Sequence, residues 1–261
     1  MQSIDTHWGR VGCSKRGAGG VPLLFLHGVG SDRTAWNDQL GTFGEDRLAI
    51  AIDMPGYGDS EPGHSEVDGR EDFARCALAV LDALGTERAH VCGLSLGGVI
   101  ALKIAALAPQ RVASLVLADS FARHAEGPAI LQRSLEGAAA LGMNGLAASR
   151  ADALLAQPAE PGVRRTVVDT MSRIDPAAYA RAAEAVWLAD QRREAAAVSC
   201  PALILYGSHD RITPAALSEE LKELIPHAGL IEIAAAGHLP NLEQPAIFNR
   251  VLAAFLADVE R

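Results

Sequence analysis

Short apolar runs recur along the chain, and each one ends at a turn residue. They lie at residues 21–26, 48–52, 90–92, 112–118, 202–206 and 230–233. Because these runs are apolar without alternation, we expect strands that are buried on both faces, as in a parallel sheet. The stretches between them, such as 72–84, 96–107 and 244–259, carry apolar residues at helical spacing. This alternation predicts an α/β fold with a mostly parallel, doubly wound sheet.

Residues 121–196 break the alternation. The segment contains no convincing strand pattern and indicates several helices rich in alanine and leucine, interrupted at Gly127-Pro128, at 157–162 and at Asp175-Pro176. A helical insertion cannot join the sheet, so we expect it to pack over one edge as a cap. The sequence therefore predicts a core made of residues 1–120 and 197–261, with a helical cap at 121–196.

Composition excludes several classes of protein. With 49% hydrophobic residues the chain can bury a sizeable core, and its net charge of -9 disfavours nucleic acid as a partner. No apolar run reaches about 18 residues, and the first residues show no signal-peptide pattern, so we expect a cytoplasmic protein that spans no membrane. The four cysteines are scattered without metal-ligand spacing, and we expect no metal and no cofactor.

A serine surrounded by glycines lies at one predicted strand end. Residues 93–97 read Gly-Leu-Ser-Leu-Gly, between the strand at 90–92 and the helix at 96–107. A nucleophile on a sharp strand-to-helix turn takes strained backbone angles, and glycines two residues to either side remove the clashes that side chains would cause. The pattern therefore predicts Ser95 as a nucleophile.

A serine nucleophile needs a base and an acid that orients the base. His238 lies in a loop after the last predicted strand, where it can reach across the edge of the sheet. Asp210 follows the strand at 202–206, and the chain order Ser95, Asp210, His238 is typical of hydrolases with a nucleophile elbow. Asp119, after the strand at 112–118, is the alternative acid.

An oxyanion intermediate also needs hydrogen-bond donors. The backbone N–H of Leu96 is one candidate, because the helix begins there. The glycine-rich turn at 26–32 lies at another strand end, and the N–H of Val29 is the second candidate. We expect His27 to hold this turn rather than to take part in the chemistry.

Five motifs resemble the α/β-hydrolase superfamily, in the order of that family and over nearly the whole chain. They are LHGVG at 26–30, DMPGYGDS at 53–60, GLSLGG at 93–98, YGSHDRITP at 206–214 and AGHLPNLEQP at 236–245. The resemblance implies the α/β-hydrolase fold with a helical cap after the sixth strand, and a triad of Ser95, Asp210 and His238. Within the superfamily the chain looks most like the 3-oxoadipate enol-lactonases of aromatic degradation. It departs from many of them in carrying a His-Gly pair at 27–28, which esterases and carbon–carbon bond hydrolases share.

The expected reaction is the hydrolysis of a small-molecule lactone or carboxylic ester. A carbon–carbon bond hydrolase and a non-catalytic small-molecule receptor on the same fold remain alternatives, and a homo-oligomer stays open. Four apolar or aromatic cap residues are candidates for lining the substrate pocket, although each could equally be a core residue: Trp187, Tyr179, Met143 and Leu131. A carboxylate on the substrate would pair with a basic cap residue such as Arg123 or Arg133.

Overall fold

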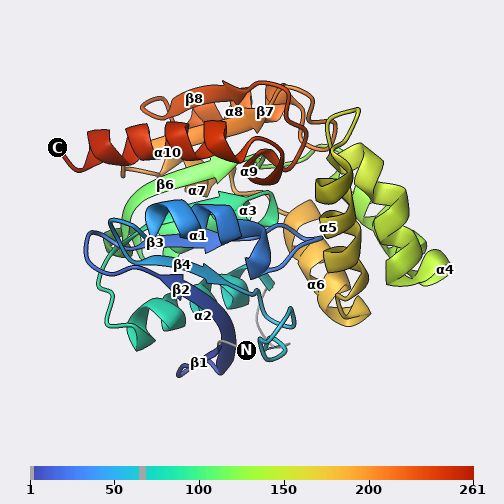
Figure 1. Ribbon diagram of the computed structural model, residues 1–261, viewed down its shortest axis with the longest axis horizontal. Helices are drawn as coiled ribbons and strands as arrows, with labels where there is room; N and C mark the ends of the chain where they lie inside the picture. Colours follow the sequence, from blue (N-terminus) through green and yellow to red (C-terminus); the bar gives the residue numbers. More distant parts are fainter. Residues whose placement is uncertain (1–2, 65–68) are drawn as a thin grey trace.

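A computed structural model describes residues 3–64 and 69–261 of the chain. Its centre is an eight-stranded sheet in the order β1-β2-β4-β3-β5-β6-β7-β8 (Figure 1). The strands are β1 (Ser3–Asp5), β2 (Arg10–Arg16), β3 (Leu23–Leu26), β4 (Ala49–Ile52), β5 (Ala89–Leu94), β6 (Val112–Ala118), β7 (Ala202–Gly207) and β8 (Gly229–Ile233). From β4 to β8 every neighbouring pair is parallel, whereas β1 and β2 pair antiparallel at one edge. The predicted α/β class with a mostly parallel sheet is confirmed.

Helices cover both faces of this sheet. On one face α2 (Gly69–Ala83), α3 (Leu96–Leu107) and α8 (Ala215–Leu224) bury apolar side chains against the strands. On the other face α1 (Asn37–Phe43) and α10 (Pro245–Val259) do the same, and they lie in front of the sheet in Figure 1. Strands covered on both sides need apolar side chains at successive positions, which explains why β3, β4, β5 and β6 are buried at every residue.

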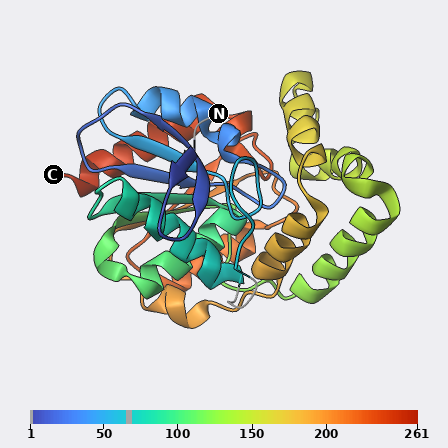
Figure 2. The ribbon, with the colours of Figure 1, turned by 90° about the horizontal axis from the view of Figure 1, so that it is seen from below.

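The segment between β6 and β7 is helical. It forms α4 (Gly127–Leu154), α5 (Pro161–Ser172), α6 (Pro176–Trp187) and α7 (Arg192–Ala196). Helices α4 to α6 project from one end of the sheet in both ribbon views (Figures 1 and 2), whereas α7 packs against α3 and α8 of the core. The core is completed by the short helices η1 (Arg33–Trp36), η2 (Pro109–Arg111) and α9 (Pro240–Glu243). Among the described residues no helix has both the length and the apolar character that crossing a membrane requires.

Candidate active site

Ser95 occupies the sharp turn between β5 and α3. Its φ of 54° and ψ of -114° are unfavourable for a residue with a side chain, and the residue is buried. The flanking glycines permit this turn. A Cβ on Gly93 would lie 2.1 Å from the carbonyl oxygen of Gly97, and one on Gly97 would lie 2.1 Å from that of Leu26. The Gly-x-Ser-x-Gly spacing thus reflects backbone contacts that leave no room for a methyl group.

This packing predicts a large loss of stability in Gly97→Ala. The added methyl group would meet a backbone carbonyl that cannot move aside. We therefore expect the free energy of unfolding to fall by about 3 kcal/mol or more. Thermal unfolding and soluble yield measure the effect. Gly41→Ala is the control, because a Cβ there meets only Arg16 Nη1, at 3.7 Å. Equal melting temperatures in the two variants would contradict this account of the turn.

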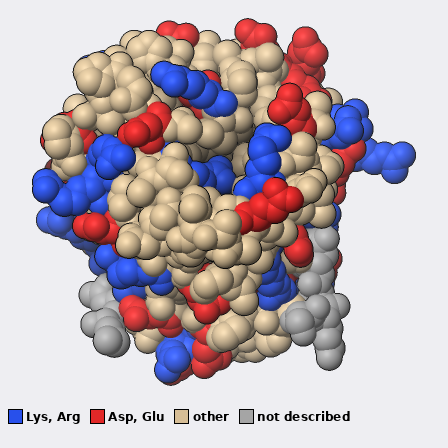
Figure 3. All heavy atoms as spheres, turned by 90° about the vertical axis from the view of Figure 1, so that its right-hand side faces the viewer, with Lys and Arg blue, Asp and Glu red and all other residues tan. Residues whose placement is uncertain are grey.

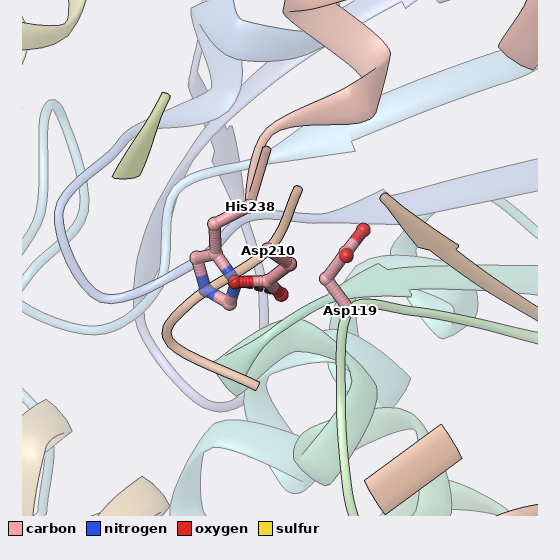
Figure 4. A group of neighbouring side chains, drawn as sticks. All are labelled: Asp119, Asp210 and His238. Carbon is pink, nitrogen blue, oxygen red and sulfur yellow. Dashed lines mark hydrogen bonds and ion pairs between the residues drawn. The ribbon is translucent and has the colours of Figure 1, made fainter. Parts of the chain in front are cut away.

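His238 and Asp210 meet at the same end of the sheet. The Nδ1 atom of His238 lies 2.8 Å from Asp210 Oδ2, and both side chains are almost fully buried. Figure 4 shows the two groups facing each other, joined by a dashed line, with Asp119 beside them. Since a carboxylate only accepts, Nδ1–H donates and Nε2 is left as the basic nitrogen.

Asp210 is held as a charged acceptor. Its Oδ1 accepts from the backbone N–H of Ile212 at 2.7 Å and of Thr213 at 3.2 Å, and its Oδ2 also accepts from the Thr213 hydroxyl. Burial alone would raise the pKa of Asp210, but the charge of His238 and these hydrogen bonds outweigh it and lower the pKa to about 2. The carboxylate is therefore ionised wherever a histidine base can work.

Asp119, the alternative acid, has a different environment. It is fully buried at the end of β6 with a φ of 43°, and its Oδ1 accepts from the backbone N–H of Gly207 at 2.8 Å. Its Oδ2 has no hydrogen-bond partner among the described residues. Burial, and then the nearby charge of Asp210, raise the pKa of Asp119 well above its usual value. The two carboxyl groups thus differ sharply, and Asp210 is the one that touches His238.

Two backbone N–H groups are free beside the serine. Within the described residues, neither Val29 N–H nor Leu96 N–H donates a hydrogen bond to the protein. The loop carrying Val29 comes so close that a Cβ on Gly28 would lie 3.4 Å from the Cβ of Ser95. These are the two donors that the sequence predicts for an oxyanion.

His27 fixes this loop. Its Nε2 accepts from the backbone N–H of Met54 at 2.9 Å, so Nδ1 carries the proton and donates to Gly28 O at 2.8 Å. Burial lowers the pKa of His27 and keeps the ring neutral. The hydroxyl of Tyr57 adds a hydrogen bond to Val29 O at 2.9 Å. His27 therefore has a bridging position between two loops.

Ser95 and His238 line one cavity beneath the cap. It encloses about 670 Å³ of empty space, part of it open to solvent, and most of its lining is apolar. Trp187 is the one of the four predicted pocket residues that lines it, and its buried indole N–H has no partner among the described residues. Leu131, Met143 and Tyr179 pack with the apolar core instead. Helix α5, which the sequence did not single out, supplies Thr166, Val167, Thr170 and Met171.

A comparison with models of protein families identifies the family of this chain. Residues 23–251 match the model described as the alpha/beta hydrolase family. The chain belongs to this family. The resemblance that the five motifs carry is thereby confirmed, and most of the hydrolase core is covered by the match.

Relatives of this α/β hydrolase carry several names. A Pseudomonas putida protein, the dihydrolipoyllysine-residue acetyltransferase component of an acetoin cleaving system, is 33% identical over 92% of this chain, which spans only 64% of that longer protein. The 3-oxoadipate enol-lactonase 1 of Acinetobacter baylyi is 27% identical, with 91% of this chain and 89% of that protein covered. Among solved structures, the enol-lactonase from Burkholderia xenovorans LB400 superposes with a TM-score of 0.91 at 26% identity, covering 98% of this chain and 100% of that one.

Glu243 is a further site residue of the hydrolase that the sequence did not single out. Its Oε1 accepts from the backbone N–H of Gly237 at 2.8 Å and its Oε2 from that of Ala156 at 2.7 Å. The backbone N–H of His238 itself donates to Leu154 O at 2.7 Å. Glu243 therefore ties the loop carrying His238 to the segment that follows α4. The signal in the sequence that could have identified Glu243 is its place in the AGHLPNLEQP motif at 236–245.

Asp119, Asp210 and His238 also offer three ligand atoms within 4.8 Å of one another. However, Asp210 Oδ2 and His238 Nδ1 lie only 2.8 Å apart, at hydrogen-bonding distance. A tetrahedral ion, with metal–ligand distances of about 2 Å, would hold these two atoms farther apart than they are. The geometry therefore fits an acid–base pair better than a metal centre.

The raised pKa of Asp119 predicts a pH-dependent gain in stability for Asp119→Asn. A carboxyl group whose pKa is raised by folding contributes stability below its unfolded pKa, and this is lost as the pH rises toward the folded pKa. Asparagine can still accept from Gly207 N–H and has no proton to lose. We expect the difference in free energy of unfolding to grow by up to about 1.4 kcal/mol per pH unit within that window.

Melting temperatures of Asp119→Asn and the wild type, measured between pH 4 and 8, test this expectation. Asp169→Asn, an exposed aspartate of α5, is the matched control and should show no such trend. A difference between Asp119→Asn and the wild type that stays constant with pH would contradict the prediction.

Proposed function

We propose that this α/β hydrolase cleaves a lactone or carboxylic ester by a Ser-His-Asp acyl-enzyme mechanism. The observation that carries the proposal is one cavity lined by both Ser95 and His238, with His238 held by the ionised Asp210. Ser95 lies on a strained turn and lines that cavity, and two free N–H groups lie beside it. These parts suffice for acyl transfer to water and require no metal or cofactor.

In the proposed mechanism, Ser95 Oγ attacks the substrate carbonyl while His238 Nε2 takes the hydroxyl proton. The N–H groups of Val29 and Leu96 stabilise the oxyanion. Collapse of the tetrahedral intermediate breaks the carbon–oxygen bond, and His238 gives its proton to the leaving oxygen. A water molecule, activated by His238, then attacks the acyl-enzyme and releases the acid, which restores the Ser95 hydroxyl.

The substrate class rests on the cavity and on the relatives. An apolar cavity with few polar groups suits a small organic acyl group. Two of the similar proteins carry the name enol-lactonase and cover nearly the whole of this chain. We therefore place lactones and esters first, with a role in the breakdown of aromatic compounds as the metabolic setting that this similarity favours.

The proposal is tested by covalent labelling together with a substrate panel. A fluorophosphonate probe should add one adduct to the intact protein, and peptide mapping should place it on Ser95. The panel contains 4-nitrophenyl acetate and butyrate, simple lactones, an enol lactone with a carboxylate, and a vinylogous diketone. Fastest turnover of the diketone would replace the proposal by carbon–carbon bond hydrolysis. Absence of both labelling and turnover would favour a small-molecule receptor.

A further inference from the structure

A second cleft adjoins the catalytic cavity, and its charged lining is mostly basic. It encloses about 1100 Å³ of space, open solvent included, between α4 and the loop that follows β7. The charged side chains that line it are Arg133, Arg150, Arg211 and Glu126. Figure 3 shows that the face carrying the cap is hollowed, with basic side chains in and beside the hollow and acidic ones nearby. A basic cleft is notable on a chain whose net charge is -9.

Arg150 connects this cleft to the active site. It lines both cavities, and it is the only Lys, Arg, Asp or Glu residue among the described residues that line the catalytic one. Its Nη1 donates to Ser134 Oγ at 2.8 Å and to Tyr179 OH at 3.2 Å. Both hydroxyl-bearing residues are buried, and both of these hydrogen bonds come from the same nitrogen of the guanidinium group, Nη1.

In the described part of the chain, the guanidinium group of Arg150 has no counter-charge and uses only Nη1 for hydrogen bonds. None of the described acidic side chains forms an ion pair with Arg150, Arg133 or Arg211, whereas Arg123 lies 3.9 Å from Asp190. The Nε and Nη2 groups of Arg150 have no hydrogen-bond partner in the described part of the chain. A half-buried cation that is held in place but lacks a counter-charge favours the binding of an anion.

We propose that Arg150 binds a carboxylate at the far end of the substrate, with Arg133 and Arg211 attracting it at the mouth of the cleft. This inference rests on the proposed function, and it narrows the substrate class to carboxylate-bearing esters or lactones. The reacting carbonyl lies at Ser95, in the apolar cavity, and the carboxylate extends toward the cleft. The planar fork of an arginine matches the two oxygens of a carboxylate, which a neutral group cannot replace.

Matched substrates test this proposal. Mono-4-nitrophenyl esters of unbranched C5 to C8 dicarboxylic acids carry a terminal carboxylate, and the corresponding terminal carboxamides have nearly the same size without charge. We expect wild-type kcat/KM to favour the acid over the amide by about tenfold or more at one chain length. The preference should fall as the salt concentration rises. A C5 dicarboxylate should inhibit competitively, and inorganic phosphate should not.

Variants assign the preference to Arg150. In Arg150→Met kcat/KM for the acid should fall at least about tenfold more than kcat/KM for the amide, so that the acid loses its advantage. Arg150→Lys should restore part of the preference because it keeps the charge without the fork. Arg165→Met, which removes an exposed arginine of α5 outside the cleft, is the matched control and should behave as the wild type.

The outcomes separate the two proposals. Equal wild-type rates for acid and amide, or a preference that survives in Arg150→Met, would overturn the carboxylate site and leave the serine hydrolase standing. Inhibition by phosphate as strong as that by the dicarboxylate would replace the carboxylate by a phosphorylated substrate. If the wild type hydrolysed none of the esters, this result would instead refute the proposed function itself.

Discussion

Replacing Ser95 by alanine should lower kcat/KM for the best ester by at least about 10⁴-fold. The variant removes the oxygen that we propose as the nucleophile, whereas the free N–H groups, the cavity and the His238–Asp210 pair remain. Steady-state kinetics with a 4-nitrophenyl ester measures the loss. The fluorophosphonate adduct should disappear from the intact protein in parallel.

Ser31→Ala is the matched control for this experiment. Ser31 lines the same cavity as Ser95, but it lies in the loop after β3 and not on the strained turn. We expect its kcat/KM to stay within about fivefold of the wild type. Turnover and labelling that persist in Ser95→Ala, or a loss of similar size in Ser31→Ala, would disprove the assignment of the nucleophile.

The second large effect is expected for Asp210→Asn, with a fall in kcat of about 10³- to 10⁴-fold. In the proposed mechanism His238 becomes an imidazolium when it takes a proton, and an asparagine cannot stabilise that charge. Its amide can also donate toward Nδ1, which would favour the wrong tautomer of the ring. KM should change much less than kcat, because Asp210 is not among the residues that line the cavity.

Asp119→Asn separates the two candidate acids. Asp119 is bonded to the backbone of Gly207 and not to His238 among the described contacts. We therefore expect kcat of Asp119→Asn to stay within about threefold of the wild type. The assignment of Asp210 would be wrong if Asp119→Asn lost more activity than Asp210→Asn.

The parallel strands and their carboxyl ends could be predicted from the sequence because continuous apolar runs end at turns. The same regularity predicts that Ser95, Asp210 and His238 lie together at the carboxyl ends of the strands. The contact between Asp210 and His238 is found there. The antiparallel edge escaped prediction because β2 is apolar over only part of its length, with exposed residues at both ends. The position of an edge strand depends on its partners more than on its own pattern.

The cap could be predicted as helical, but its contacts could not. Which face of a helix meets the active site depends on how the helices pack, and α4 changes direction at Gly142, where φ is 64°. Tyr179 was predicted as a pocket residue but instead holds Arg150 by its hydroxyl. Arg150 itself had no distinguishing local pattern, since a lone arginine on a helix is usually solvated.

The hydrogen bonds between the cap and the loop carrying His238 restrict how a substrate can reach Ser95. Leu154 O and the N–H of Ala156 are bonded to His238 and Glu243, and a Cβ on Gly237 would lie 2.6 Å from Ala156 N. Lifting the cap at this end would pull His238 away from Asp210. We therefore expect the end of α4 to act as a fixed anchor and not as a hinge. Substrate and product should then enter and leave beside the cap, while His238 stays in contact with Asp210 throughout turnover.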